Sequence, residues 1–281
     1  MKTGIGSMAL DVGVIGFGAI GQSLVDVIGA SDHVGRLVVV VRPGRAAAAR
    51  ARLADMPSRC CANVDVVESP EILFAPGFDV VVECAGHAGL AAFGQGVLTA
   101  GTDLVVASVG ALADDALLET LRTAAAGSGA QIILPSGAIG GIDVLAAARR
   151  AGVDQVIYTG RKPPGAWAGS AAEQIVALDD LETPAVFFEG TARAAAQQFP
   201  KNANVAATLA LAGIGMDRTQ VRLIADPTAT GNTHAYQVRS PVVDFTVELE
   251  GKATADNPRT SQSTVYSLAR AVLNRAETIV I

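Results

Sequence analysis

A glycine-rich turn between an apolar strand and a helix is the feature that most constrains this chain. The segment "DVGVIGFGAIGQSLVDVI" places Gly16, Gly18 and Gly21 in a G-x-G-x-x-G pattern directly after a strand-like run. Gly16 allows the tight turn, Gly18 lets the backbone approach a pyrophosphate, and Gly21 lets the helix pack close to the strand. The N–H groups that begin the helix, near Ala19 and Ile20, would hold the phosphates. The segment predicts dinucleotide binding; the alternative is a glycine-rich turn without a ligand.

The alternation of apolar strands and helix-length segments continues to about Pro135, through "RLVVVV", "VDVVE", "FDVVVECAG", "TDLVVAS" and "AQIILPS". This α/β pattern is typical of a parallel sheet with helices on both faces. After Ser136, strand-like runs such as "QVRLIAD" and "VVDFTVELEGKA" predominate. We therefore expect a Rossmann-type, doubly wound parallel sheet over residues 1–135. We expect an α+β, largely antiparallel substrate and oligomerisation domain over 136–253, and a C-terminal segment, 254–281, whose helix packs back on the first domain.

Composition excludes several classes of function. The net charge of −6 and the scattered arginines leave no basic face for nucleic acid. No apolar run approaches the roughly 20 residues of a membrane span, and the start of the chain shows no secretion signal. Cys60, Cys61 and Cys84 have neither metal-ligand nor disulfide-framework spacing. We expect a cytoplasmic enzyme with small-molecule partners and no metal, assembled as a homo-oligomer, in the simplest case a homodimer.

The loop after the second strand bears on the choice between NAD and NADP. An acidic residue about 20 positions past the glycine motif normally takes the ribose 2′-hydroxyl, whereas an arginine there can accept a 2′-phosphate. The chain has "VVVVRPGR", with Arg42 and Arg45 and no acidic residue. The loop is therefore compatible with NADP, and NAD stays open. The alternative is that both arginines are solvated loop residues.

Three later strand ends, "ECAGHAG", "ASVGAL" and "LPSGAIGG", finish in small residues. Because ligands of doubly wound sheets lie outside the carboxyl ends of the strands, Gly86, Gly110 and Ala138 are candidates to contact the nicotinamide half of the cofactor. Ordinary turns need glycine at similar places. His87 could also reach the cofactor, although a capping or solvated histidine is the simpler interpretation.

Four blocks of the sequence together resemble the L-aspartate dehydrogenase family: "GVIGFGAIG", "LPSGAIGGIDVLAAAR", the stretch from "FPKNANVAATLALAG" to "ADPTATGNTHAYQV", and "DNPRTSQSTVYSLARAV". They cover nearly the whole chain. The resemblance implies a two-domain enzyme of amino-acid metabolism that oxidises L-aspartate with NAD or NADP. The product would be iminoaspartate, which hydrolyses to oxaloacetate and ammonia or feeds NAD biosynthesis. By the same resemblance His234 is the catalytic residue, and Ala138 and Asn204 contact the cofactor.

A histidine suits this chemistry, because the amine must lose a proton before hydride leaves Cα, and water must later be activated. Alternation along "THAYQV" predicts that His234 and Tyr236 share one face of a strand while Thr233 and Ala235 share the other. We expect His234 to lie at an exposed strand end that faces the nicotinamide, with Asn232 nearby to orient the substrate.

Two substrate carboxylates require cationic or hydroxyl donors. The candidates, each of which could equally be an ordinary solvent-facing residue, are Ser136, Arg161, Lys162, Lys201, Asn232 and Thr233. Asn202 or Asn204 could also cap the apolar helix that follows them.

Two other functions fit the same architecture. One is an NADP-dependent reductase of another imine or aldehyde, of the dihydrodipicolinate or homoserine type, with Lys162 as the proton donor. The other is a catalytically silent dinucleotide sensor, which would keep the glycine loop and lose the catalytic group.

Overall fold

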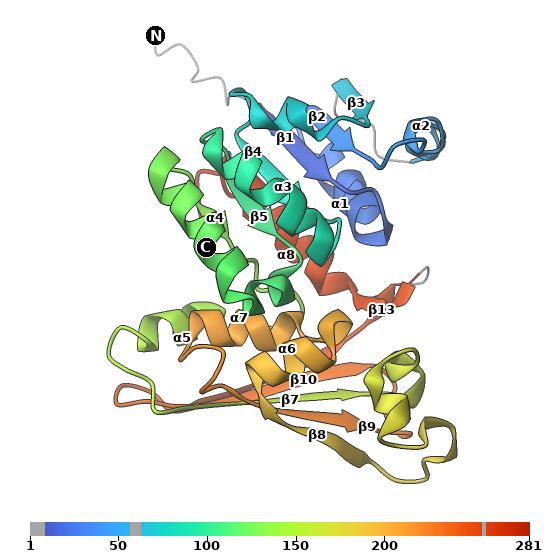
Figure 1. Ribbon diagram of the computed structural model, residues 1–281, viewed down its shortest axis with the longest axis vertical. Helices are drawn as coiled ribbons and strands as arrows, with labels where there is room; N and C mark the ends of the chain where they lie inside the picture. Colours follow the sequence, from blue (N-terminus) through green and yellow to red (C-terminus); the bar gives the residue numbers. More distant parts are fainter. Residues whose placement is uncertain (1–8, 57–62, 255–256) are drawn as a thin grey trace. The chain divides into compact units, whose positions relative to one another are not determined.

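The computed structural model describes residues 9–56, 63–254 and 257–281, and the chain separates into two compact units (Figure 1). Unit 1 comprises residues 1–108, 116–135 and 265–281, and unit 2 comprises residues 109–115 and 136–264. Residues 109–115 thus group with unit 2, whereas the predicted boundary at residue 135 placed them with the first domain. Of the C-terminal segment, residues 265–281 group with unit 1. Cys60, Cys61 and the first eight residues, where no secretion signal was expected, lie outside the described residues.

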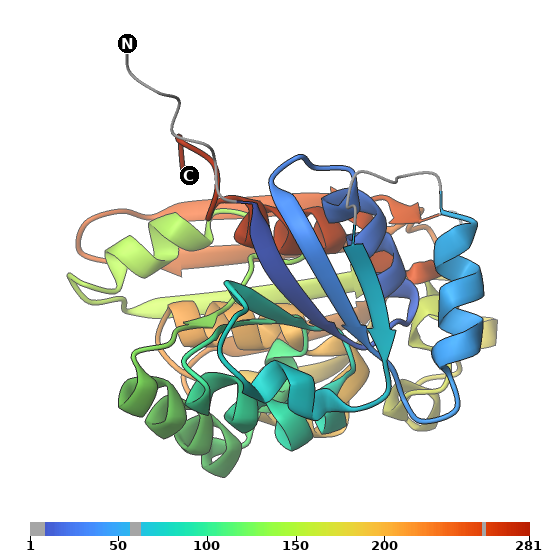
Figure 2. The ribbon, with the colours of Figure 1, turned by 90° about the horizontal axis from the view of Figure 1, so that it is seen from above.

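Unit 1 is built on a parallel sheet. Its described strands are β1 (Leu10–Ile15), β2 (Val34–Val40), β3 (Asn63–Val67), β4 (Val80–Glu83), β5 (Asp103–Val106) and β6 (Ile132–Ile133). They lie in the order β3-β2-β1-β4-β5-β6, with parallel neighbours throughout. Figure 2 shows β1, β2 and β3 side by side. The strand order reverses beside β1, as in doubly wound dinucleotide-binding sheets, so the predicted Rossmann-type fold is confirmed.

Helices from both ends of the chain complete the core of unit 1. The helical segments that belong wholly or mostly to unit 1 are α1 (Ala19–Gly29), α2 (Ala46–Ala54), η1 (Pro70–Phe74), α3 (His87–Thr99), α4 (Asp115–Ser128) and α8 (Gln262–Leu273). Val12 and Val14 of β1 are fully buried in one cluster with Leu24 of α1 and with Leu268 and Val272 of α8. Burying each such side chain contributes about 1.5–3 kcal/mol, so the last helix is part of the core that the first residues begin.

Unit 2 contains a mixed sheet. Its strands are β7 (Gln155–Lys162), β8 (Ala185–Thr191), β9 (Gln220–Ala225), β10 (Asn232–Arg239) and β11 (Phe245–Gly251), in the order β11-β10-β7-β9-β8. In these described strands β7 and β9 are parallel, and the other pairs are antiparallel. The predicted α+β, largely antiparallel second domain is confirmed. The sequence analysis did not identify β8, because an irregular register between Val186 and Phe188 interrupts its alternation.

Helices lie on one face of the unit 2 sheet. The helical segments are η2 (Val109–Ala113), α5 (Ile142–Ala148), η3 (Pro164–Trp167), η4 (Ala171–Gln174), η5 (Leu178–Asp180), α6 (Ala192–Gln198), η6 (Pro200–Asn202) and α7 (Asn204–Ala212), and the strands β12 (Ala253–Thr254) and β13 (Asn257–Ser261) form a small separate pair. Figure 1 shows α5, α6 and α7 on the same side of the sheet. In β10, Tyr236 and Val238 are buried while Gln237 and Arg239 are exposed, which is the alternation expected when one face is covered. Across the described residues, no helix is long and apolar enough to cross a membrane.

Candidate active site

The glycine loop of unit 1 has the geometry that a dinucleotide requires. Gly16 has a positive φ of 96°, and a Cβ there would lie 2.7 Å from the carbonyl oxygen of Cys84. A Cβ on Gly21 would lie 2.2 Å from the oxygen of Gly16, whereas the space beside Gly18 is open. Helix α1 begins at Ala19 without a side-chain cap and without an acidic residue in its first turn. Its first N–H groups are therefore free of side-chain acceptors, and this loop fits a pyrophosphate.

The loop after β2 carries two exposed cations. Arg42 and Arg45 are exposed, and neither forms an ion pair with a described residue. A carboxylate reaches the same loop from the end of β3, because Glu68 Oε1 accepts a hydrogen bond of 2.9 Å from the backbone of Ala46. Backbone N–H groups of Ala46 and Gly44 lower the pKa of Glu68. An acidic residue was expected directly after β2, and Glu68 follows β3 instead.

A buried carboxylate lies at the carboxyl end of β4. Glu83 is fully buried, and its oxygens accept hydrogen bonds from the backbone of Ala85, Gly86 and Ser108 and from the Ser108 hydroxyl. Gly86 precedes α3 with a positive φ of 85°, and His87 is the first residue of that helix, half-buried, with a pKa that burial lowers. Glu83 was not among the predicted site residues, although an ionisable residue at the end of an apolar strand is a signal visible in the sequence.

Two predicted cofactor residues are bonded to each other in unit 2. The backbone N–H of Gly110 donates to Asn204 Oδ1 at 2.9 Å. Asn204 is the first residue of α7, which has no side-chain cap, so the hypothesis that Asn204 caps its own helix is wrong. Ala138 lies in a turn that is closed by a backbone hydrogen bond from Ile139 to Ser136, and both Ala138 and Ser136 are half-buried.

His234 lies inside unit 2. It is the third residue of β10 and is 4% exposed, so the predicted exposed strand end is wrong. The reason is that β10 pairs on both edges, with β7 and with β11, and the face that carries His234 is the buried one. The predicted alternation is confirmed, because His234 and Tyr236 are both buried while Thr233 and Ala235 belong to the other face.

Tyr158 holds the ring of His234. The Tyr158 hydroxyl and His234 Nδ1 are 2.7 Å apart, and the two rings are nearly parallel. His234 lies opposite Gly160 in the β7–β10 register. A Cβ on Gly160 would lie 2.7 Å from the Tyr158 hydroxyl, so glycine at this position leaves the space that the hydroxyl occupies. Tyr158 was not among the predicted site residues, although the alternation of "YTGRK" places Tyr158, Gly160 and Lys162 on one face.

Lys162 adds a buried cation to the same face of the sheet. Its side chain is 7% exposed, its Nζ donates to Asn202 Oδ1 at 2.8 Å, and it lies 4.8 Å from the centre of the Trp167 ring. Among the residues that the structure describes, no carboxylate lies within ion-pair distance of Nζ. Burial lowers the pKa of Lys162 to about 8.

The protonation states of this cluster follow from burial. Burial and, secondly, the charge of Lys162 lower the pKa of His234 to about 3, so its imidazole is neutral at physiological pH. Burial raises the pKa of Tyr158, which therefore keeps its proton. The cluster thus contains one neutral imidazole, one neutral phenol and one lysine that can exchange its proton close to neutral pH.

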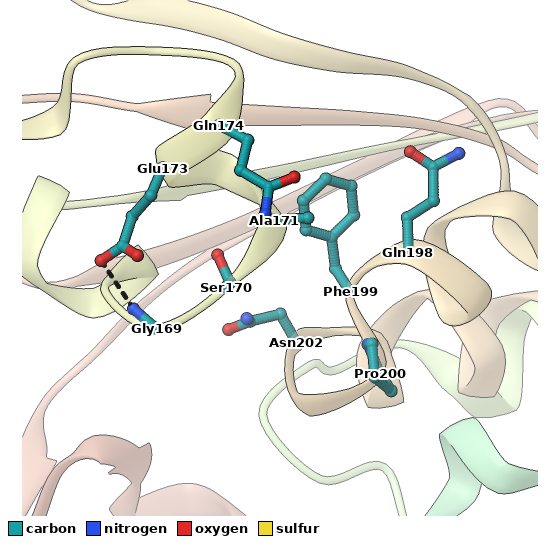
Figure 3. A pocket seen from close by; sticks show the side chains of 9 residues that line it. All are labelled: Gly169, Ser170, Ala171, Glu173, Gln174, Gln198, Phe199, Pro200 and Asn202. Atoms are coloured by element: carbon teal, nitrogen blue, oxygen red, sulfur yellow. Dashed lines mark hydrogen bonds between the residues drawn. The ribbon is translucent and has the colours of Figure 1, made fainter.

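A cavity of about 400 Å³ opens beside Asn202 (Figure 3). Its lining mixes polar and apolar residues and comprises Gly169, Ser170, Ala171, Glu173, Gln174, Gln198, Phe199, Pro200 and Asn202. Figure 3 shows Asn202 extending toward the loop that carries Ser170. Because Asn202 Oδ1 accepts from Lys162, one residue joins the cavity wall to the buried ammonium group.

The remaining predicted substrate residues are not all brought together. Arg161 forms an ion pair of 2.7 Å with the buried Asp226, so its charge already has a partner. Thr233 pairs with Arg161 in register, on the face opposite His234. Asn232, two residues before His234, shares its face and is half-buried. Lys201 belongs to η6.

A doubly wound sheet with an open glycine loop in unit 1, together with a buried His–Tyr–Lys cluster in unit 2, defines an NAD(P)-dependent oxidoreductase. The chain is 46% identical to the L-aspartate dehydrogenase of Polaromonas sp. over 97% of its own length and 100% of that protein. It is 43% identical to the L-aspartate dehydrogenase of Pseudomonas aeruginosa over 96% of its length and 99% of that protein. The chain belongs to the L-aspartate dehydrogenase family, and the predicted resemblance is confirmed.

Family models and a solved structure agree with this assignment. Residues 143–275 match the model described as aspartate dehydrogenase, C-terminal, and residues 16–135 match the model described as homoserine dehydrogenase, NAD binding domain. The aspartate dehydrogenase structure from Thermotoga maritima superposes with a TM-score of 0.75 at 27% identity, covering 97% of this chain and 99% of that one. The predicted cofactor, NAD or NADP without a choice between the two, is confirmed.

Proposed function

We propose that the protein catalyses the oxidative deamination of L-aspartate with NAD or NADP, giving iminoaspartate and then oxaloacetate and ammonia, and that His234 is the general acid–base. The observation that carries the mechanism is the buried cluster of His234, Tyr158 and Lys162, which the hydrogen bond from Lys162 to Asn202 joins to the wall of a cavity. A neutral imidazole next to a buried cation suits a substrate that brings two carboxylates and one proton to be removed.

The cofactor would be held by residues of the glycine loop and of the later strand ends. When bound, the cofactor would supply the nicotinamide as acceptor of the hydride from the substrate Cα. The free N–H groups that begin α1 bind the pyrophosphate, and exposed Arg42 is available for the adenosine end. The proposed contact residues are Gly16, Gly18, Ala19, Ile20, Gly21, Arg42, Gly86, Gly110, Ala138 and Asn204.

His234 would move the proton at Nε2, because Tyr158 engages Nδ1. Its low pKa keeps the ring neutral, with Nε2 unprotonated, and makes it a weak base in the absence of substrate. The charge of Lys162 is one cause of that low pKa, so a bound carboxylate that offsets this charge increases the proton affinity of His234. Substrate binding would thereby prepare the base that it needs.

Lys162 would hold one carboxylate of the substrate. A buried charge without an ionic partner is costly, and a carboxylate would supply the partner that the described residues lack. Asn232 and Ser136 are further donors for the substrate, whereas Thr233 is unsuited to this role because it points to the opposite face.

Replacing His234 with alanine tests the catalytic role. We expect kcat for L-aspartate to fall roughly 10²–10⁴-fold, the usual contribution of a general acid–base, while NADP affinity stays nearly unchanged. His33→Ala is the matched control, because His33 is half-buried and precedes the amino end of β2 in unit 1, and it should keep kcat. Near-full kcat in the His234→Ala enzyme would remove the assignment.

A reductase of another imine or aldehyde, with Lys162 as the proton donor, is the second candidate, because the pKa of Lys162 lies near 8. The discriminating assay follows NAD(P)H formation at alkaline pH with L-aspartate, homoserine and other amino acids. Aspartate-dependent turnover rejects a silent sensor, and preference for homoserine rejects the main proposal. In Lys162→Met, a higher KM at retained kcat indicates a carboxylate anchor, whereas loss of kcat at saturating substrate indicates a proton donor.

Two further proposals concern the cellular compartment and the oligomeric state of the enzyme. We propose that it works in the cytoplasm, which the free thiol of Cys84 supports. We also propose that two copies associate through the face of the unit 2 sheet that carries Gln237, Arg239 and Glu248, which are exposed within the unit. A monomer in sedimentation at micromolar concentration would reject the dimer.

A further inference from the structure

We infer that Glu83 is a positioning residue that shapes the surface on which the nicotinamide half of the cofactor binds. Its carboxylate is fully buried. It accepts hydrogen bonds from Ala85 N at 2.7 Å, Gly86 N at 2.8 Å, Ser108 N at 3.0 Å and Ser108 Oγ at 3.0 Å. The inference depends only on dinucleotide binding and not on the identity of the amino-acid substrate.

The place of Glu83 in the sheet connects it to one half of the cofactor. In a doubly wound sheet each half binds one mononucleotide outside the carboxyl ends of its strands. The turn between β1 and α1 takes the pyrophosphate and the end of β2 takes the adenosine ribose, which leaves the β4–β6 half for the nicotinamide nucleotide. Glu83 is the last residue of β4, and Ser108 lies just beyond β5. The carboxylate therefore ties together the two strand ends that this half of the cofactor meets.

A carboxylate is the side chain that this set of contacts requires. All four partners are donors in the described geometry, three on Oε1 and one on Oε2. A glutamine of the same shape would turn its NH₂ group toward at least one of these donors. No cation is paired with Glu83 in the described chain. Burial raises the pKa of the Glu83 carboxyl, and the hydrogen bonds from Ser108, Ala85 and Gly86 oppose this rise by favouring the charged form. These hydrogen bonds in turn fix the loop conformation.

The loop that Glu83 fixes also forms a wall of the pyrophosphate turn. Its residue Cys84 presents the carbonyl oxygen that a Cβ on Gly16 would approach to 2.7 Å. Gly86, held by its N–H, has the positive φ from which α3 starts. Precise placement of binding groups depends on such supporting hydrogen bonds behind the contact residues. Glu83 therefore acts on the cofactor through the loop and not by touching it.

The experiment compares a whole dinucleotide with its adenosine half. Binding of NADH and of ADP-ribose is measured by calorimetry for the wild type, Glu83→Gln and Glu119→Gln; Glu119 is an exposed glutamate of unit 1, so its variant is the matched control. We expect Glu83→Gln to weaken NADH binding about tenfold or more, as expected when one charge-assisted hydrogen bond is removed. ADP-ribose affinity should stay within about twofold of the wild type, and the control should change neither.

A milder variant covers the case in which Glu83→Gln does not fold. Ser108→Ala removes only the hydroxyl contact, and it should weaken NADH binding by a few-fold while ADP-ribose binding is retained. Unchanged NADH affinity in both variants, or equal losses for NADH and ADP-ribose in either one, overturns the inference. Because the assay involves no aspartate turnover, its failure is separate from any failure of the proposed function.

Discussion

Replacing Lys162 with methionine should stabilise the protein at neutral pH. Methionine keeps the unbranched shape and removes the charge. Burial lowers the pKa of Lys162 from 10.5 to about 8, and at 1.36 kcal/mol per pH unit this amounts to about 3 kcal/mol of unfavourable burial of the ammonium form. Removal of the hydrogen bond to Asn202 offsets about 1 kcal/mol of this. The net expectation is a gain in the free energy of unfolding of about 2 kcal/mol at pH 7.

The pH dependence of the free energy of unfolding tests separately that the buried charge of Lys162 destabilises the folded protein. Between pH 8 and pH 10.5 the unfolded chain keeps the Lys162 proton and the folded protein has lost it, so the unfolded state binds more protons. Wild-type stability therefore rises with pH in this window through Lys162, and the cost is fully present below pH 8. In Lys162→Met this contribution is absent.

Guanidinium unfolding of the wild type and Lys162→Met at pH 7, 8, 9 and 10 measures both effects. The variant should be the more stable protein at pH 7, and its advantage should vanish or reverse by pH 10. Lys252→Met, at an exposed lysine, should follow the wild type at every pH. Succinate, an unreactive dicarboxylate, should flatten the wild-type slope, because an anion beside the ammonium favours its charged form. Parallel pH profiles for the wild type and Lys162→Met would refute the reasoning.

Two further changes test the geometry around His234 and the cofactor. Gly160→Ala places a Cβ 2.7 Å from the Tyr158 hydroxyl, so the hydrogen bond from Tyr158 to His234 should break. The free energy of unfolding should fall by about 1–3 kcal/mol and kcat by at least tenfold. Unchanged kcat would show that this bond does not position the ring. Neutral replacements of both Arg42 and Arg45 should weaken the binding of NADP more than that of NAD, by about 1–3 kcal/mol for each charge-assisted hydrogen bond to the 2′-phosphate that is removed. Isothermal titration can measure both affinities. Equal effects on the two cofactors would show that both arginines are solvated loop residues.

The features that could be predicted from the sequence are local ones. The three roles in the glycine loop depend on residues within a few positions of one another, and the structure gives Gly16 its positive φ and Gly21 its close contact. The alternation along β10 likewise placed His234 and Tyr236 on one face. Such periodicities depend only on the order of consecutive residues, so they can be recognised in a single sequence.

The features that were missed depend on partners far along the chain. His234 is buried because β7, with Tyr158 at a separation of 76 residues, pairs beside it. The carboxylate of Glu83 finds Ser108 at a separation of 25 residues. Asn204 looks like a helix cap in its own sequence context, yet its side chain binds Gly110, 94 residues away. One sequence contains no direct record of such pairings.

The position of α8 has a consequence for how the protein is made. Leu268 and Val272 complete the core cluster that contains Val12 and Val14 of β1, but the ribosome adds them about 250 residues later. Chains emerge at roughly 5–20 residues per second, so the apolar surface that α8 covers waits on the order of ten seconds or more while unit 2 is synthesised. The first unit to begin synthesis is thus finished last, and a nascent chain stopped before residue 262 exposes that surface to chaperones.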